Sequence, residues 1–351
     1  MTDESAAKKG FDTAAVSAWY EAHVPGAKGP VTWELIAGGH SNLTYGVTDA
    51  NGTTTVLRRP PLSHVLASAH DMGREHRIIS ALHPTGLPVP RPLGFCADPA
   101  VNGAPFYVME FVPGVVLHDV FIAERELDEK ERRATGESFI DVLADLHSVD
   151  PDAVALRDFA KKEDYIQRQL KRWYGQFQQS KTRELPAVDR VHDVLRAKIP
   201  AQHGASVVHG DYRLGNSITQ KPGKIAAVLD WEICTLGDPL ADLGYVMATW
   251  PHPDDPIQIA PGTSAGPPSL AKGFPRREEL LERYAKRSAR DLSQIDFYLA
   301  FSYWKSACII EGVYARYIGG ALGKANVNLD AFKQQIENFA NFAEETVARV
   351  K

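Results

Sequence analysis

The stretch from Val207 to Tyr245 constrains this chain more than any other part of its sequence. It reads VVHGDYRLGNSITQKPGKIAAVLDWEICTLGDPLADLGY. Its first residues form a short apolar strand, a polar loop follows, and a second strand is predicted over Ile225 to Leu229. An acidic turn begins at Asp230, and a helix begins near Pro239. Polar side chains therefore lie on tight loops between buried strands.

Three side chains in this stretch suit phosphoryl transfer from ATP. Such a transfer needs a group that accepts the proton of the acceptor hydroxyl, and metal ligands that hold the phosphates in line. Asp211 is the candidate base, and Asn216, on the same loop, is a neutral oxygen ligand. Asp230 ends the next strand and is the second candidate ligand, because Mg²⁺ favours oxygen atoms. The alternative is a loop of ordinary turn residues, since Asp, Asn and Gly favour turns.

The pattern H-x-D-x-x-x-x-N followed by a strand-ending Asp resembles the aminoglycoside phosphotransferase family, a branch of the protein-kinase-like fold. The longer sequence of this stretch, HGDYRLGN…AVLDWEICTLGDPLADLGY, is similar to kinase-like domains associated with acyl-CoA dehydrogenases. The resemblance implies a bilobal α+β fold. Residues 1–112 would form an N-terminal nucleotide-binding lobe with a five-stranded antiparallel sheet and a helix. Residues 113–351 would form a larger, mainly helical catalytic and acceptor-binding lobe. ATP and Mg²⁺ are the implied cofactors.

Short segments in the N-terminal part read as strands. They are predicted over 32–37, 43–48, 53–58, 91–96 and 106–111. Asn51-Gly52 between the second and third is a strong hairpin signal. The turn between the first two strands holds Gly39, Ser41 and Asn42, which the resemblance places over the ATP phosphates.

The resemblance implies further nucleotide contacts on the third strand and the next helix. Val56 would cover the adenine, and Arg58 stands where the family often has a phosphate-binding lysine. Arginine keeps the positive charge and can bind phosphate oxygens bidentately, so this departure preserves binding in principle. Glu75, on a helix predicted over 70–82, would pair with Arg58. The alternatives are a solvated strand end and a solvated helical glutamate.

Residues 107–114, YVMEFVPG, resemble the hinge of a kinase. Met109 would border the adenine, and the backbone of Glu110 and Val112 would hydrogen-bond the base edge. The structural alternative, a buried strand followed by a turn, is compatible with this functional interpretation.

Beyond the hinge the apolar periodicity is helical. Helices are predicted over 131–148, 164–179, 276–287, 293–319 and 329–350. Four of their side chains are candidates for binding an anionic acceptor: Arg172, Trp173, Lys305 and Arg316. The alternative is that the aromatic residues belong to the core and the cations to solvated faces.

Other polar residues of this half are interpreted as supports. His209 would brace the catalytic loop, and Asp238 and Asp242 would cap the following helix and fix the loop. Ser293 with Asp296 resembles a capping box.

Composition excludes several classes of protein. The net charge of −5 gives no overall attraction to nucleic acid. No run of about 18 apolar residues predicts a membrane span, and the first residues lack the apolar core of a signal peptide. The three cysteines show neither metal-ligand spacing nor a disulfide framework. We therefore expect a cytoplasmic protein whose partner is a small molecule.

The leading interpretation is an ATP-dependent kinase that phosphorylates a hydroxyl of a small molecule. The likeness to acyl-CoA dehydrogenase-associated domains favours a hydroxyacyl-CoA or a related hydroxy acid. An aminoglycoside, choline-like or sugar-like acceptor stays open. A catalytically inert nucleotide-binding module is the second class, and only Arg58 in place of lysine favours it. A metal-dependent hydrolase would need clustered histidines, which the sequence does not show.

Overall fold

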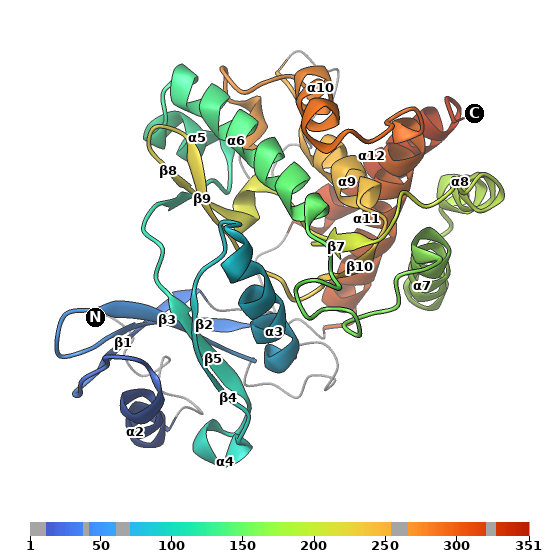
Figure 1. Cartoon of the computed structure of the whole chain (residues 1–351). Coiled ribbons are helices and arrows are strands. Elements are labelled where there is room, and N and C mark those ends of the chain that lie inside the picture. The colour runs from blue at the N-terminus through green and yellow to red at the C-terminus, as the bar shows by residue number, and fades with distance from the viewer. Residues whose placement is uncertain (1–11, 38–41, 61–70, 254–265, 321–327, 351) are drawn as a thin grey trace. The chain divides into compact units, whose positions relative to one another are not determined.

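The computed structural model describes residues 12–37, 42–60, 71–253, 266–320 and 328–350 (Figure 1). The chain divides into two compact units. The first joins Met1–Pro113 with Ala226–Cys234, and the second joins Gly114–Ile225 with Thr235–Lys351. The lobe boundary at residue 112 stays a prediction, but the segment that carries Asp230 has its contacts in the first unit.

The first unit is built on the predicted five-stranded sheet. Its strands are β1 (Thr32–Ala37), β2 (Leu43–Thr48), β3 (Thr54–Arg59), β4 (Pro92–Cys96) and β5 (Phe106–Glu110). Their order in the sheet is β1-β2-β3-β5-β4, and every neighbouring pair is antiparallel. Gly52, with a φ of 78°, lies in the turn between β2 and β3, where a left-handed residue suits the tight connection.

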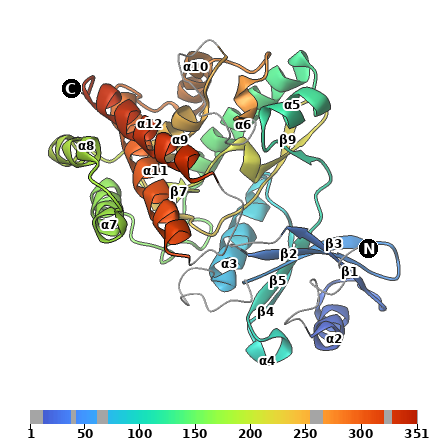
Figure 2. The same ribbon diagram turned by 180° about the vertical axis from the view of Figure 1, so that it is seen from behind.

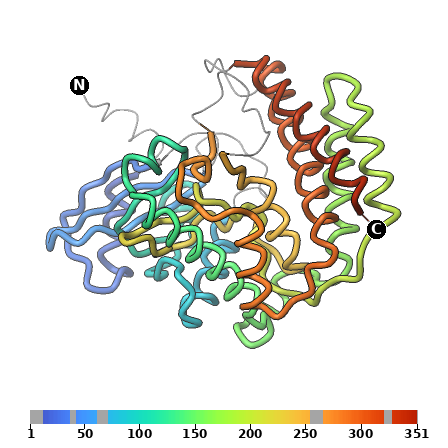
Figure 3. Tube along the Cα trace, turned by 90° about the horizontal axis from the view of Figure 1, so that it is seen from above, coloured from blue at the N-terminus to red at the C-terminus, as the bar shows by residue number. Residues whose placement is uncertain are grey.

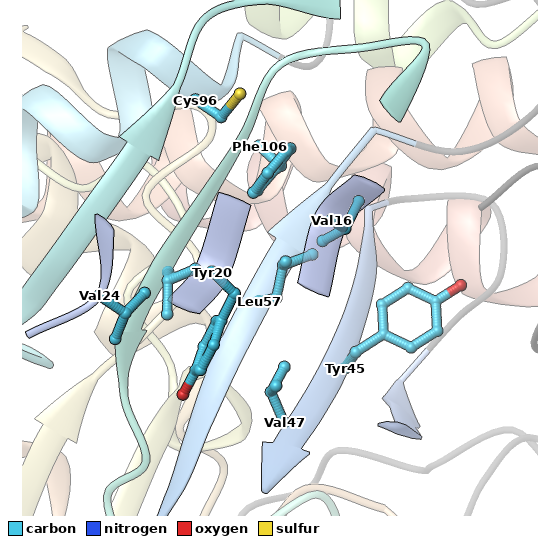
Figure 4. Close-up of a cluster of buried hydrophobic side chains, with 9 residues drawn as sticks. Val16, Tyr20, Val24, Tyr45, Val47, Leu57, Cys96 and Phe106 are labelled. Carbon is cyan, nitrogen blue, oxygen red and sulfur yellow. The ribbon is translucent and has the colours of Figure 1, made fainter. Parts of the chain in front are cut away.

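One face of this sheet is covered by helix α2 (Thr13–His23). Val16 and Tyr20 of the helix pack against Val47, Leu57 and Phe106 of the strands, as Figure 4 shows. These side chains are at most 1% exposed, and each large apolar side chain buried in this way contributes about 1.5–3 kcal/mol. The cluster shows that the face of β3 that carries Leu57 packs against α2.

The opposite face carries the functional side chains of β3. Because side chains alternate along a strand, Val56 and Arg58 point away from the α2 cluster that holds Leu57. Helix α3 (Met72–Leu82) contacts β4 and β5 and buries Glu75, Ile78 and Ile79. Short helices η1 (His83–Thr85) and α4 (Pro99–Asn102) complete the unit.

The second unit is mainly helical, as predicted. Its helices are α5 (Val120–Glu126), α6 (Glu129–Ser148), α7 (Tyr165–Ser180), α8 (Pro186–Ala197), α9 (Leu240–Thr249), α10 (Arg277–Ser288), α11 (Ile295–Ile318) and α12 (Leu329–Val347). Short helices η2 (Leu214–Asn216) and η3 (Pro268–Leu270) lie in connections. Helix α11 packs along α12 and α9, and α7 and α8 also contact it (Figures 2 and 3). In the part of the chain that the structure describes, no helix is long and apolar enough to cross a membrane.

Two small sheets frame the loop that holds Asp211. Strand β7 (Ser206–Val208) pairs antiparallel with β10 (Thr235–Gly237). Strand β6 (Val115–Val116) pairs with β8 (Ser217–Gln220), and β9 (Lys224–Val228) is the third strand of that sheet. The loop therefore leaves one sheet at residue 208 and enters the other at residue 217.

The capping box expected at Ser293 and Asp296 is wrong. The N–H and hydroxyl of Ser293 both donate to Asp291, and helix α11 begins only at Ile295 with Gln294 as its N-cap. The carboxylate of Asp296 is instead paired with Arg349. A nearer aspartate thus captures the serine before the helix starts.

Candidate active site

In the first unit, Arg58 is at the centre of a cluster of acidic side chains. Its Nη1 lies 3.0 Å from Oε1 of Glu75, and its Nη2 donates to Oδ1 of Asp230 over 2.5 Å. Oε2 of Glu232 is 4.0 Å from the same Nη2. Strand β3 supplies Arg58 and helix α3 supplies Glu75. The turn after β9 supplies Asp230 and Glu232.

The guanidinium of Arg58 thus lies within 4.0 Å of three carboxylates. Burial, helped by the charges of Asp230 and Glu232 and opposed by the charge of Arg58, raises the pKa of Glu75 to about 7. Burial alone would lower the pKa of Arg58, but the charges of Glu75, Tyr107 and Asp230 together outweigh it, and the pKa lies above its ordinary value. Arg58 therefore stays cationic at the centre of an acidic environment.

Asp230 has an unusual backbone, with a φ of 65°. Aspartate is among the few residues that tolerate this left-handed conformation, which recurs at functional sites. The turn aims the carboxylate at Arg58, and two residues later Glu232 accepts a hydrogen bond from Nδ2 of Asn42 over 3.2 Å. Asn42 is 6% exposed, and its Oδ1 has no hydrogen-bond partner among the described residues. Gly39 and Ser41, predicted to lie beside it, are outside the described residues.

The predicted adenine-side residues lie together on the sheet face that carries Arg58. Val56 and Met109 are directly paired across β3 and β5, and each is 7% exposed. The N–H of Glu110 donates to the carbonyl of Arg91, so that N–H is not the group that would meet a base edge. Val112 follows β5 in an irregular connection and is half-buried. Their roles toward a nucleotide stay predictions.

In the second unit, the catalytic loop is held by its backbone. Oδ2 of Asp242 accepts the N–H of His209 over 2.6 Å, and Oδ1 accepts that of Gly210 over 2.8 Å. Gly210 has a φ of 87°, which a side chain would strain. His147 lies 3.4 Å from the same carboxylate and is itself bonded to Tyr284. This agrees with the interpretation of Asp242 as a support of the loop.

His209 and Asp238 also act as supports. Nδ1 of His209 accepts the N–H of Asp211 over 3.2 Å. Asp238 accepts the N–H of Leu240 at the start of α9 and the hydroxyl of Tyr298. His209 thus stabilises the backbone at Asp211, and Asp238 stabilises the start of α9.

The carboxylate of Asp211 has a donor on each oxygen. Tyr245 donates its hydroxyl to Oδ1 over 2.5 Å. Nδ2 of Asn216 donates to Oδ2 over 2.8 Å and to the Asp211 carbonyl over 2.9 Å, and Nε of Arg213 lies 3.3 Å from Oδ2. Because Asn216 uses its nitrogen for Asp211, its other end, Oδ1, is the atom left to face a metal. The Asp211 side chain keeps 28% of its surface exposed.

Lys305 reaches the same loop from helix α11. Its Nζ donates to the carbonyl of Gly210 over 3.2 Å and lies 5.6 Å from the ring of Tyr245 and 5.7 Å from that of Trp173. Arg172 also lies over the Trp173 ring, at 4.9 Å from its centre. Burial lowers the pKa of Lys305, and the charges of Asp242 and Asp211 oppose this shift.

Of the four acceptor-side candidates, the structure thus gathers Lys305, Trp173 and Arg172. Arg316 lies eleven residues after Lys305 on α11, about 16 Å further along the helix at 1.5 Å per residue. Arg316 is exposed at that point of the helix. Its assignment to the acceptor stays a prediction.

Tyr245 and Glu232 were not predicted as site residues. Tyr245 stands three residues after Asp242, so both face one side of α9, and this spacing was the available signal. Glu232 stands two residues after Asp230 in an acidic turn, and no local pattern distinguishes the two carboxylates as partners of Asn42. The contacts of both residues join segments that are distant in sequence, so a local pattern does not predict them.

Comparisons with known proteins agree with this geometry. The model of a phosphotransferase enzyme family matches residues 32–291. Acyl-CoA dehydrogenase family member 10 of Mus musculus is 36% identical over 299 residues, which cover 85% of this chain and 28% of that protein. Acyl-CoA dehydrogenase family member 11 of Homo sapiens is 33% identical over 322 residues, which cover 88% of this chain and 40% of that protein. The chain therefore spans well under half the length of these relatives.

A crystal structure from Ralstonia eutropha JMP134, assigned provisionally as an aminoglycoside phosphotransferase, shares the fold. It is 36% identical, with a TM-score of 0.83, over 97% of this chain and 99% of that one. The antiparallel sheet and the helical second unit confirm the predicted α+β, kinase-like class. This chain belongs to the phosphotransferase enzyme family that includes the aminoglycoside phosphotransferases, and it is related to the acyl-CoA dehydrogenase family members 10 and 11.

Proposed function

We propose that the protein is an ATP-dependent phosphotransferase that phosphorylates a hydroxyl group of a small molecule. The observation that carries the proposal is the Asp211 carboxylate, which is part-exposed and held by Asn216, Tyr245 and Arg213. A carboxylate held in one orientation can accept or orient the proton of an alcohol, which is the main demand that a loose phosphoryl-transfer transition state makes on a base.

The residues of the first unit suit Mg²⁺-ATP. Asp230 presents a carboxylate there, an oxygen group that Mg²⁺ favours, and the buried Oδ1 of Asn42 has no partner among the described residues. We propose that Asp230 and Asn216 each supply one oxygen to Mg²⁺, and that Arg58 and Glu75 act as the phosphate-binding pair. Bound Mg²⁺ would neutralise charge on the phosphates. Gly39, Ser41, Val56, Met109, Glu110 and Val112 are the further proposed nucleotide contacts.

We further propose an anionic hydroxyacyl acceptor, such as a hydroxyacyl-CoA. The relatives named as acyl-CoA dehydrogenase family members support this class. The cations Lys305 and Arg172 beside Trp173 support it independently, because a positive environment favours an anion over a polycationic aminoglycoside. An aminoglycoside stays the second candidate because of the provisional assignment of the Ralstonia protein.

A panel of hydroxyl acceptors tests both levels of the proposal. ADP release is measured with Mg²⁺-ATP and 3- and 4-hydroxyacyl-CoAs, free hydroxy acids, kanamycin-type aminoglycosides or choline. Asp211→Asn is the blank, and Asp141→Asn, which removes one charge of a surface pair with Arg283, is the matched control. Turnover on one class that is lost only in the blank supports the kinase and identifies its acceptor class.

Other results would contradict the proposal at different levels. Turnover on aminoglycosides alone would overturn the acyl-CoA assignment. Binding of Mg²⁺-ATP without turnover on any acceptor would favour an inert nucleotide-binding module. Failure to bind ATP at all would contradict the roles of Arg58 and the residues around Met109.

A further inference from the structure

One turn of helix α9 contacts the loop that carries Asp211 through two side chains, the carboxylate of Asp242 and the hydroxyl of Tyr245. Asp242, in the first turn, accepts the N–H groups of His209 and Gly210, and Tyr245, three residues later, donates to Oδ1 of Asp211. Residues three apart on a helix face the same side. Helix α9 therefore fixes both the path of the loop and the orientation of the side chain at its tip.

The helix is itself closely packed. A Cβ atom added at Gly244, next to Tyr245, would lie 2.5 Å from the carbonyl oxygen of Tyr298 on α11. That close approach brings α11 near enough for Lys305 to donate to Gly210 and to lie 5.6 Å from the Tyr245 ring. The tyrosine ring consequently has little freedom to move away from Asp211.

The two oxygens of Asp211 have different surroundings. Oδ2 accepts from Asn216, the proposed metal ligand, and from Arg213, whereas Oδ1 accepts the hydroxyl of Tyr245. A carboxylate oxygen has two lone-pair directions, so Oδ1 can accept from Tyr245 and from one more hydroxyl. The acceptor hydroxyl is therefore best received at Oδ1.

We propose that Tyr245 is a positioning residue that holds Oδ1 of Asp211 toward the acceptor hydroxyl and prevents a competing pairing of the carboxylate with Arg213. This inference rests on the proposed kinase function. In the transfer, the acceptor oxygen forms a bond to the γ-phosphorus as the bond from that phosphorus to the β–γ bridging oxygen breaks. ADP keeps the electron pair of that broken bond, and the hydroxyl proton moves to Oδ1.

The Asp211 carboxylate can pair with Arg213 instead, because Arg213 is positively charged and close to it. Its Nε is already 3.3 Å from Oδ2, and its side chain is 43% exposed and thus able to move. Arginine and carboxylate groups favour bidentate pairing, in which both oxygens accept from the guanidinium. Without the Tyr245 hydroxyl, rotation into this pair would turn Oδ1 away from the acceptor.

Tyr245→Phe tests the proposal, with Tyr174→Phe as the matched control. The control removes an equivalent tyrosine–carboxylate hydrogen bond, to Asp189 over 2.8 Å, between α7 and α8. The acceptor is the panel member with the highest turnover, or water if none reacts. We expect Tyr245→Phe to lower kcat about 10- to 100-fold, as small misplacements of reacting groups do, with KM for Mg²⁺-ATP changed less than about 2-fold. The control should keep both constants.

The double variant separates positioning from general damage. If Arg213 captures the freed carboxylate, Arg213→Gln should raise kcat in the Tyr245→Phe enzyme relative to its effect in the wild type. Additive effects of the two substitutions, or a kcat of Tyr245→Phe equal to that of Tyr174→Phe, would overturn the role of Tyr245. A wild type no more active than Asp211→Asn would instead overturn the kinase function, and the role of Tyr245 with it.

Discussion

Arg58 donates to Asp230, which lies 172 residues later in the chain, while its other terminal nitrogen lies 3.0 Å from Glu75. One guanidinium thereby joins strand β3, helix α3 and the turn after β9. The planar fork of arginine presents donors in two directions at once, whereas the ammonium of lysine is a single compact charge. The arginine that departs from the common lysine is thus suited to the two carboxylates that it meets here.

Removing this cation should destabilise the protein and weaken nucleotide binding. Arg58→Ala leaves Glu75 as a buried carboxyl without its partner, and we expect the free energy of unfolding to fall by about 3–5 kcal/mol. Chemical denaturation measures this, with Arg157→Ala, at an exposed pair with Asp152, as the control. Arg58→Lys should recover part of the stability and keep Mg²⁺-ATP binding. Equal stability of the alanine and wild-type proteins would contradict a structural role for the pair.

The Glu75 carboxyl should make stability depend on pH. Its pKa in the folded protein is raised to about 7, from an ordinary value of 4.5, chiefly by burial. The folded state therefore binds the proton more tightly than the unfolded state. This contribution is fully present below pH 4.5 and is lost as pH rises through about 7.

Glu75→Gln should remove that pH dependence, because glutamine does not titrate. The free energy of unfolding, measured without nucleotide between pH 4.5 and 8, should fall less steeply in the variant than in the wild type, with each unit of pKa difference worth about 1.4 kcal/mol. Glu345→Gln on helix α12 serves as a surface control. Parallel curves for wild type and Glu75→Gln would show that burial does not raise this pKa.

The sheet and the long helices were predictable because their apolar spacing reflects burial. Leu57 falls on the core face and Arg58 on the other, as strand alternation predicts. The short strand β10 (Thr235–Gly237) was missed, since three residues carry no measurable periodicity and it is defined only by its pairing with β7.

Contacts between segments distant in sequence could not be derived from local pattern. The left-handed turn that brings Asp230 to Arg58, and the bond from Tyr245 to Asp211, depend on how the chain folds back on itself. The motif and the family resemblance identified Asp211 and Asn216 as candidates. They did not identify the groups that donate to each oxygen of the Asp211 carboxylate. The donor on Oδ1, Tyr245, comes from helix α9, which packs against α11.

Asp242 should be indispensable to the loop. Its two oxygens accept separate N–H groups, from His209 and Gly210, and asparagine would offer only one oxygen to the pair. We expect Asp242→Asn to lower the free energy of unfolding by about 2–3 kcal/mol, because a buried donor loses a charged acceptor. Activity should fall with it. Asp291→Asn, at an exposed turn, is the control, and a fully stable Asp242→Asn protein would contradict the clamp.

Lys305 should separate acceptor binding from nucleotide binding. Its Nζ is buried between the Gly210 carbonyl and the rings of Trp173 and Tyr245, so Lys305→Met removes the charge while keeping the apolar stem. For an anionic acceptor, we expect KM for the acceptor to rise at least about 10-fold, equivalent to about 1.4 kcal/mol, with KM for Mg²⁺-ATP nearly unchanged. Lys198→Met removes another lysine–carbonyl bond, to Val350, and should leave both constants as they are. An unchanged acceptor KM in Lys305→Met would show that this lysine does not recognise an anionic group. Steady-state kinetics with each substrate varied in turn decides between these outcomes.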